Sequence, residues 1–139
     1  MSGAPKQFDY TIVFDGGSKG NPGWGYGSYE ISARTGASKQ KRLEFGDAVT
    51  NNEAEYLTLI AALDELAAMI ARHDREPSTF SVRVRGDSQL VIQQLLGRWK
   101  VKHPNIRPLH ERARVLLARF RASDLAWHAR ANSVRTLGH

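Results

Sequence analysis

The amino-acid sequence predicts a single α/β domain over residues 1–139, built on a five-stranded mixed sheet with helices on both faces. Two observations lead to this prediction. Short segments of alternating apolar residues, separated by glycine-rich turns, fill the first third of the chain and indicate three antiparallel strands. Helical spacing then alternates with strand spacing, which is typical of crossovers between parallel strands.

The antiparallel part is expected in three segments. FDYTIVFD (8–15) alternates aromatic and branched residues and ends at a run of glycines. WGYGSYEIS (24–32) is the second strand, and the tight turn before it suggests a hairpin. KRLEF (41–45) is a short third strand.

The rest of the chain carries the helices and the parallel strands. Apolar residues fall at helical spacing from 52 to 72, and Thr50 or Asn51 can cap that helix. Strands are predicted at 80–88 and 124–130, and helices at 88–97 and 109–120. The basic segment 98–108 connects those two helices, and 133–139 is at most a helical stub.

Composition limits the function classes. The net charge is +6 and the isoelectric point about 10, so the surface attracts polyanions such as nucleic acid, although a merely soluble basic protein fits composition equally well. The chain has no cysteine, which excludes disulfides and thiolate metal sites. It has no apolar run of membrane-spanning length and no signal-peptide pattern. We therefore expect a soluble cytoplasmic monomer that does not bind membranes.

Three acidic residues stand at the ends of predicted elements. Asp15 and Asp87 end two strands, where ligands gather in α/β sheets, and Glu55 heads the apolar face of the long helix. Each acid alone also has an ordinary explanation as a turn aspartate or a helix-dipole partner. Together, converging carboxylates need a cation or a proton. Hard oxygen donors without His or Cys suit Mg²⁺ or Mn²⁺, and two such ions hydrolyse phosphodiesters.

Three motifs resemble those of the ribonuclease H type 1 family, in the family's order and spacing. They are DGGSKGNPGWGYG, TNNEAEY and GDSQLVI, and the resemblance extends from about Tyr10 to about Asn132. It implies the ribonuclease H-like fold and a metal-dependent endonuclease. Such an enzyme cuts the RNA strand of RNA/DNA hybrids with two Mg²⁺ or Mn²⁺ ions and leaves 5′-phosphate and 3′-hydroxyl ends. Asp15, Glu55 and Asp87 match the family's first three metal-binding acids.

The resemblance also implies contacts to the hybrid. The glycine-rich residues match the loop that reads the RNA strand near the cut, and these are Gly16, Gly17, Ser18 and Asn21. Asn52 and Gln89 match residues that touch 2′-hydroxyls in the minor groove. Thr50 and Asn51 match the edge that holds a DNA phosphate, although both are first of all helix-capping types.

The connector adds a further candidate contact. Trp99, Lys100 and Lys102 combine aromatic and basic groups that suit a nucleic-acid backbone, while Trp99 could equally belong to the core. Some family members carry an extra basic helix at this place. The segment is too short to hold one, so the chain resembles the family's compact form.

The family's fourth acid has no counterpart. It is expected four residues after Asn132, where Thr136 stands. Asn132 through its carbonyl oxygen, or His139 on the same face as Thr136, is the candidate that completes the second metal site. Two alternatives stay open: a catalytically impaired hybrid-binding module, and a related nuclease for double-stranded RNA. The retained acids argue against a pure binder, because clustered negative charge repels phosphate.

Overall fold

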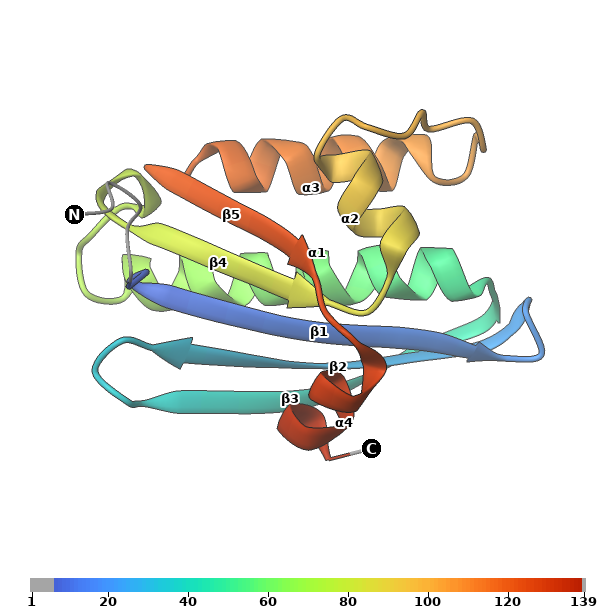
Figure 1. Cartoon of the computed structure of the whole chain (residues 1–139), viewed down its shortest axis with the longest axis horizontal. Helices are drawn as coiled ribbons and strands as arrows, with labels where there is room; N and C mark the ends of the chain where they lie inside the picture. The colour runs from blue at the N-terminus through green and yellow to red at the C-terminus, as the bar shows by residue number, and fades with distance from the viewer. Residues whose placement is uncertain (1–6, 139) are drawn as a thin grey trace.

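The computed structural model describes residues 7–138 and shows one five-stranded sheet (Figure 1). The strand order is β3-β2-β1-β4-β5. β1 pairs antiparallel with β2 and β2 with β3, whereas β1, β4 and β5 run parallel. The predicted mixed sheet is therefore confirmed. The strands are β1 (Tyr10–Lys19), β2 (Gly23–Ala33), β3 (Ser38–Val49), β4 (Ser81–Gly86) and β5 (Ala122–Trp127).

Helices cover both faces of the sheet, as predicted. The long α1 (Asn51–Ala71) packs behind β1 and β2, whereas α4 (Arg130–Leu137) lies in front of the antiparallel strands (Figure 1). The first helix packs in turn against α3 (Arg107–Ala118), and α2 (Gln89–Leu95) follows β4. None of the helices within residues 7–138 is both long and apolar enough to cross a membrane.

The main core lies between the sheet and α1. Ile12 and Phe14 of β1 alternate with more exposed neighbours, and both side chains are buried. Leu59, Leu63 and Leu66 of α1 are spaced three or four residues apart and are fully buried against that face. The apolar residues at strand spacing in β1 and those at helical spacing in α1 therefore form one apolar layer.

Several element boundaries differ from the prediction. β3 extends over Ser38–Val49 rather than 41–45, and β5 ends at Trp127 rather than at residue 130. The first strand does not stop at Asp15 but continues through the glycines to Lys19, because β2 supplies a pairing partner along its whole length. The C-terminal segment is a helix of 8 residues rather than a stub. Gly138 ends it in the left-handed conformation, with a φ of 80°, and its N–H donates to the Val134 carbonyl.

A capping box starts α1 beside the glycine-rich strand. Thr50 Oγ1 accepts from the Glu53 N–H at 3.1 Å, and a Glu53 carboxylate oxygen accepts from the Thr50 N–H at 2.9 Å. Of the two expected caps, Thr50 is thus the one used. The cap fixes where the helix begins, and with it the position of Glu55.

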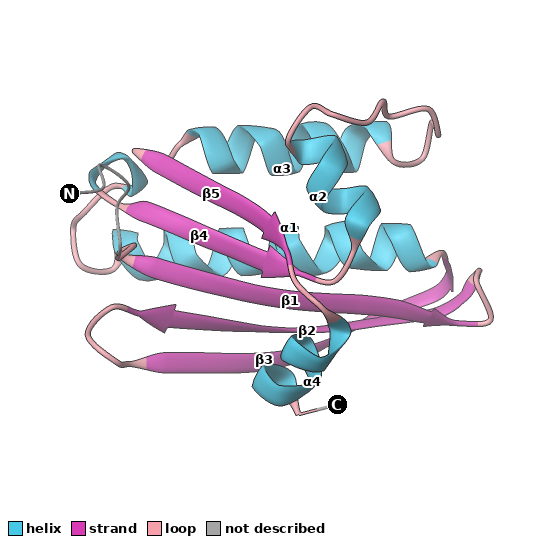
Figure 2. Cartoon of the chain, in the orientation of Figure 1, coloured by secondary structure: helices cyan, strands magenta, loops and turns pink. Residues whose placement is uncertain are grey.

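The connector between α2 and α3 contains no helix. Figure 2 shows this segment as a loop, in which turns or bends occupy residues 96–99 and 104–106 and residues 100–103 are irregular. The expected absence of an extra basic helix between these two helices is confirmed.

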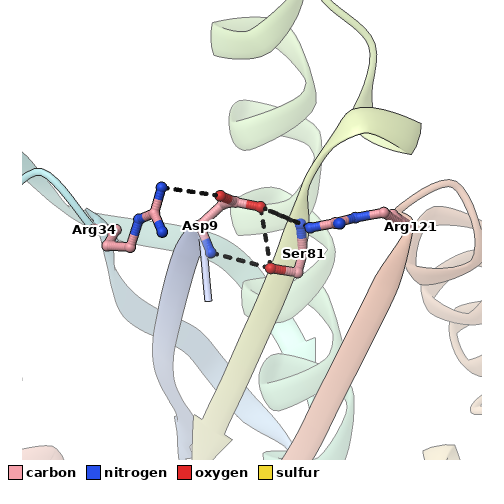
Figure 3. A network of polar contacts seen from close by, with 4 residues as sticks. All are labelled: Asp9, Arg34, Ser81 and Arg121. Atoms are coloured by element: carbon pink, nitrogen blue, oxygen red, sulfur yellow. Dashed lines mark hydrogen bonds and ion pairs between the residues drawn. The ribbon is translucent and has the colours of Figure 1, made fainter. Parts of the chain in front are cut away.

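Asp9 joins the starting ends of three strands into a polar network (Figure 3). Its Oδ2 accepts from the Ser81 N–H at 2.8 Å and from Ser81 Oγ at 3.1 Å. Arg121 Nη2 donates to the same oxygen at 3.3 Å, and Arg34 lies 3.9 Å from Oδ1. The Ser81 backbone hydrogen bond, more than the arginine charges, lowers the pKa of Asp9.

Replacing Asp9 by Ala is expected to lower the free energy of unfolding by about 1–3 kcal/mol, because the change leaves hydrogen-bond donors of Ser81 unpaired. The folded-state pKa lies below 3.8, so this stabilisation is present above that pH and is lost as pH falls through the folded-state pKa. Urea denaturation of wild type and variant at neutral and acidic pH measures both effects. Asp64→Ala, which breaks an exposed pair with Arg112, is the control and should cost much less. An equal loss in both variants would contradict the prediction.

Candidate active site

Asp15, Glu55 and Asp87 meet at one point of the structure. One carboxylate oxygen from each lies within 4.8 Å of the others. β1 and β4 are neighbours and pair Phe14 with Gly86, so the residues that follow, Asp15 and Asp87, are side by side. Glu55 reaches them from the start of α1. The predicted convergence of the three acids is confirmed.

Gly16 permits this convergence by its lack of a side chain. A Cβ at Gly16 would lie 2.6 Å from the Ala54 carbonyl oxygen and 2.8 Å from the Glu55 amide nitrogen. The backbones of β1 and α1 are therefore in contact directly beside Asp15 and Glu55. The glycine predicted to approach the substrate has a first use within the chain itself.

The three acids form a strongly unfavourable set of charges on their own. Burial raises the pKa of Glu55 to about 8, a hydrogen bond from Ser88 opposes that rise, and the charges of Asp15 and Asp87 add to it. Asp87 has an 8% exposed side chain, and its Oδ2 atom is buried without a hydrogen bond. An unsatisfied carboxylate oxygen beside two further acids is the environment that a divalent cation relieves. The all-oxygen donor set fits Mg²⁺ or Mn²⁺.

Arg130 is a functional candidate that the sequence reasoning missed. Its Nη1 lies 3.5 Å from Asp87 Oδ2, while 72% of its side chain is exposed. It follows β5, which pairs in parallel with β4, so it emerges beside the residue that follows β4. The strand order was the available signal. Because β4 and β5 are parallel neighbours, a cation just after β5 lies next to an acid just after β4.

A polar cleft of about 480 Å³ surrounds the acids. Asn51 and Asn52 line it from the start of α1, and Gln89 lines it from the start of α2. Gly16 and Gly17 line it from β1. Five of the residues expected to contact substrate therefore share one cleft with the three acids.

Other predicted substrate residues lie near the cleft. Asn21 and Thr50 line an adjoining cavity of about 330 Å³, which shares Asn52 with the cleft. The Ser18 N–H donates to Asn51 Oδ1 at 2.7 Å, and the Asn51 N–H donates to Asn21 Oδ1 at 3.0 Å. These contacts hold the turn after β1 against the start of α1.

The predicted contacts of the connector lie on its surface. Trp99 is 49% exposed, which excludes the alternative that it belongs to the core. Lys100 and Lys102 are also exposed. The structure therefore leaves all three side chains available to a ligand.

The C-terminal candidates are occupied in other ways. The Asn132 carboxamide oxygen accepts from Arg135, and the Thr136 carbonyl accepts from Gln40 of β3 at 2.9 Å. Of the residues of α4, Arg130 is the one that lines the cleft. His139 lies outside the described residues.

Sequence comparison places this chain among known proteins. A family described as "Reverse transcriptase-like" matches residues 33–135. The "Bifunctional protein Rv2228c" of Mycobacterium tuberculosis is 38% identical over 124 residues, and "Ribonuclease HI" of Halobacterium salinarum is 39% identical over 125 residues. Each match covers 88% of this chain, but only 32% of the first relative and 57% of the second. The chain thus spans about a third of the mycobacterial protein's length.

Structural comparison agrees with the sequence matches. The N-terminal RNase H domain of the mycobacterial protein superposes with a TM-score of 0.79 and 34% identity, over 93% of this chain and 88% of that one. RNase H1 of the archaeon Halobacterium salinarum gives 0.77 and 35%, with 92% of each chain covered. LC11-RNase H1, solved in complex with an RNA/DNA hybrid, gives 0.77 and 27%, over 91% and 89%. With the acids, the sheet order and these matches in agreement, the chain belongs to the ribonuclease H type 1 family.

Proposed function

We propose that this chain is an endoribonuclease that hydrolyses the RNA strand of RNA/DNA hybrids, with two Mg²⁺ or Mn²⁺ ions, and leaves 5′-phosphate and 3′-hydroxyl ends. One observation carries the proposal: Asp15, Glu55 and Asp87 bring carboxylate oxygens within 4.8 Å of one another at the base of a polar cleft. Family membership and the hybrid bound to the related LC11 enzyme support the choice of substrate.

The chain's own residues divide the work of binding. Asp15, Glu55 and Asp87 would hold the ions, which when bound activate a water molecule and stabilise the leaving oxygen. Gly16 lines the cleft with its backbone, which can contact a sugar–phosphate strand beside the acids. Asn52 contributes an exposed carboxamide that suits the 2′-hydroxyl by which RNA differs from DNA.

Further contacts extend along the substrate. Gly17, Ser18, Asn21 and Gln89 would complete the reading of the RNA strand, and Thr50 and Asn51 would hold the DNA phosphate. The exposed connector side chains Trp99, Lys100 and Lys102 would follow the nucleic-acid backbone. The expectation of a monomer in the cytoplasm stays a prediction, which gel filtration and cell fractionation would test.

Cleavage assays with four different substrates test the proposal. Labelled RNA/DNA hybrid, double-stranded RNA, single-stranded RNA and DNA duplex are each incubated with the protein in Mg²⁺, in Mn²⁺ and in a chelator. We expect cutting of the hybrid's RNA strand alone, dependent on the ions, with product ends that a 3′-hydroxyl-dependent polymerase can extend. Hybrid binding without cutting would instead identify the impaired module, which the neutral Thr136 favours. Equal cutting of double-stranded RNA would overturn the substrate assignment.

The second metal site gives a separate prediction. We expect Asn132→Ala to reduce kcat/KM by about 10–100-fold, because the Asn132 carboxamide oxygen, which accepts from Arg135 in the structure, would turn to the second ion as a ligand. Thr136→Ala should be nearly silent, because the hydrogen bond from Gln40 is accepted by the main-chain carbonyl of Thr136, which the substitution keeps. Removal of His139 tests the other candidate ligand. Hybrid cleavage and Mn²⁺ affinity, measured together, distinguish the three variants. A loss in Thr136→Ala as large as that in Asn132→Ala would contradict the assignment.

A further inference from the structure

Another cavity, apart from the one lined by Asn21 and Thr50, adjoins the active-site cleft. It has a volume of about 570 Å³, within the range of ordinary ligand pockets. Tyr26 and Arg130 line both the cavity and the cleft, so the two are continuous at these residues. None of the residues expected from the sequence to contact substrate lines this cavity.

Strand register explains why the cavity leads directly away from the acids. Asp15 of β1 pairs with Ser28 of β2, and Ser28 pairs with Arg42 of β3. One step along the same face, Tyr26 pairs with Glu44. Alternate residues share a face of a sheet, so the metal-binding aspartate and the cavity lie on one surface. That is the face in front of which α4 lies in Figure 1.

The chemistry of the cavity combines exposed aromatic rings with positive charge. Trp24 is 44% exposed and Tyr26 is 37% exposed, side by side on one face of β2. Trp24 Nε1 donates to Glu44 Oε1 at 2.7 Å, which holds the indole in place. Lys19, Arg42 and Arg130 supply three cations, against the single carboxylate of Glu44.

We propose that this cavity, the β2–β3 subsite, binds the RNA strand where it continues as a single strand beyond the hybrid. Lys19 and Arg42 contact its phosphates, and an unpaired base stacks on Trp24 or Tyr26. The inference rests on the proposed function, because it takes the strand held at the acids to be RNA. Rings accept a base only when it is unstacked, and the cations match a polyanion, so a single strand suits the cavity better than a duplex.

Arg130 connects this subsite to the cleft. It lies at the border of both cavities and pairs with Asp87, while most of its side chain is exposed. A phosphate between the two cavities is therefore within reach of a guanidinium already positioned at the acids. Positive side chains therefore lie at both ends of the surface between the acids and Trp24, with Arg130 beside Asp87 and Lys19 beside Trp24.

Overhang substrates test the subsite. Four fluorescent hybrids share one duplex and differ in the RNA strand: blunt, with a single-stranded extension at its 5′ end, with one at its 3′ end, and with an abasic extension. Dissociation constants are measured by fluorescence anisotropy with Ca²⁺ in place of Mg²⁺, and a denaturing gel reports any cutting. The readout is the ratio of blunt to extended dissociation constants. We expect an extension on one side to tighten binding about tenfold, and the abasic extension to recover only part of that gain.

Matched variants assign the gain to the cavity. Trp24→Ala should remove the part that depends on bases, and Arg42→Ala the part that persists with the abasic strand. Arg114→Ala, which removes a cation paired with Glu111 on α3, should keep the full ratio. A ratio near one for both extensions, or a tenfold ratio that survives Trp24→Ala and Arg42→Ala, would overturn the subsite. If the ratio behaves as expected but Mg²⁺ produces no cutting, the nuclease assignment fails while the subsite stands.

Discussion

Replacing Asp87 by Asn is expected to reduce hybrid cleavage by about 10³-fold without unfolding the protein. The change removes one of three carboxylates that converge within 4.8 Å, and a carboxamide oxygen is a much weaker ligand for a divalent ion. Stability should not fall, because Asp87 Oδ2 makes no hydrogen bond in the structure and loses only a loose pair with the exposed Arg130. Loss of negative charge also relieves repulsion with Glu55.

A nearby aspartate supplies the matched control for that variant. Asp124 lies on β5, the strand next to β4, and its Oδ2 accepts a hydrogen bond from Arg85 Nη2 at 2.7 Å. Asp124 does not line the cleft that holds the three acids. Asp124→Asn should keep cleavage and lower the melting temperature slightly, the reverse of Asp87→Asn. Single-turnover cleavage and thermal melts of both variants measure the contrast. Unchanged cutting by Asp87→Asn would remove the metal site as the origin of activity.

The sequence predicted the fold and the acids well because both depend on simple periodicities. Strand and helix spacing placed Asp87 at the end of a strand and Glu55 at the head of an apolar stripe, whereas Asp15, which was also expected at a strand end, lies within β1. Once β1 and β4 are neighbours, these positions must converge. The extent of β1 was wrong because glycines usually interrupt strands, and only pairing with β2 shows that they continue this one.

Roles that depend on tertiary contacts could not be predicted from the sequence. Arg130 is one of many arginines, and only the neighbouring positions of β4 and β5, which its local pattern does not reveal, indicate that its guanidinium lies beside Asp87. The family resemblance assigned Asn51 and Asn21 to substrate contacts. The structure adds hydrogen bonds through which these residues hold the turn after β1 against the start of α1. Trp24 and Tyr26 resemble ordinary strand residues until the register places them on the face that carries Asp15. Each of these facts requires knowing which surface a side chain shares.

The second large effect concerns the pH dependence of stability without divalent ions. The pKa of Glu55 is raised from 4.5 to about 8, mainly by burial. Between these two values the folded protein holds a proton that the unfolded chain releases, so the free energy of unfolding should fall as pH rises through this window and level off above it. Divalent ions replace the proton as the balancing positive charge, so their stabilising effect should grow with pH in the same range.

Glu55→Gln is expected to remove most of this dependence. The glutamine keeps the shape of the side chain but cannot ionise, so the variant should be more stable than wild type at pH above 8 in chelator, while it loses cleavage and the stabilisation by Mg²⁺. Urea denaturation across the pH range, with chelator and with Mg²⁺, measures the difference. Glu111→Gln on the surface of α3 is the control and should keep the wild-type profile. If wild type and Glu55→Gln lose stability in parallel as pH rises, Glu55 is not the group that carries the proton, and another group is responsible for the pH dependence. If the profiles diverge as expected, the same carboxylate that destabilises the ion-free protein is the one that makes it bind metal.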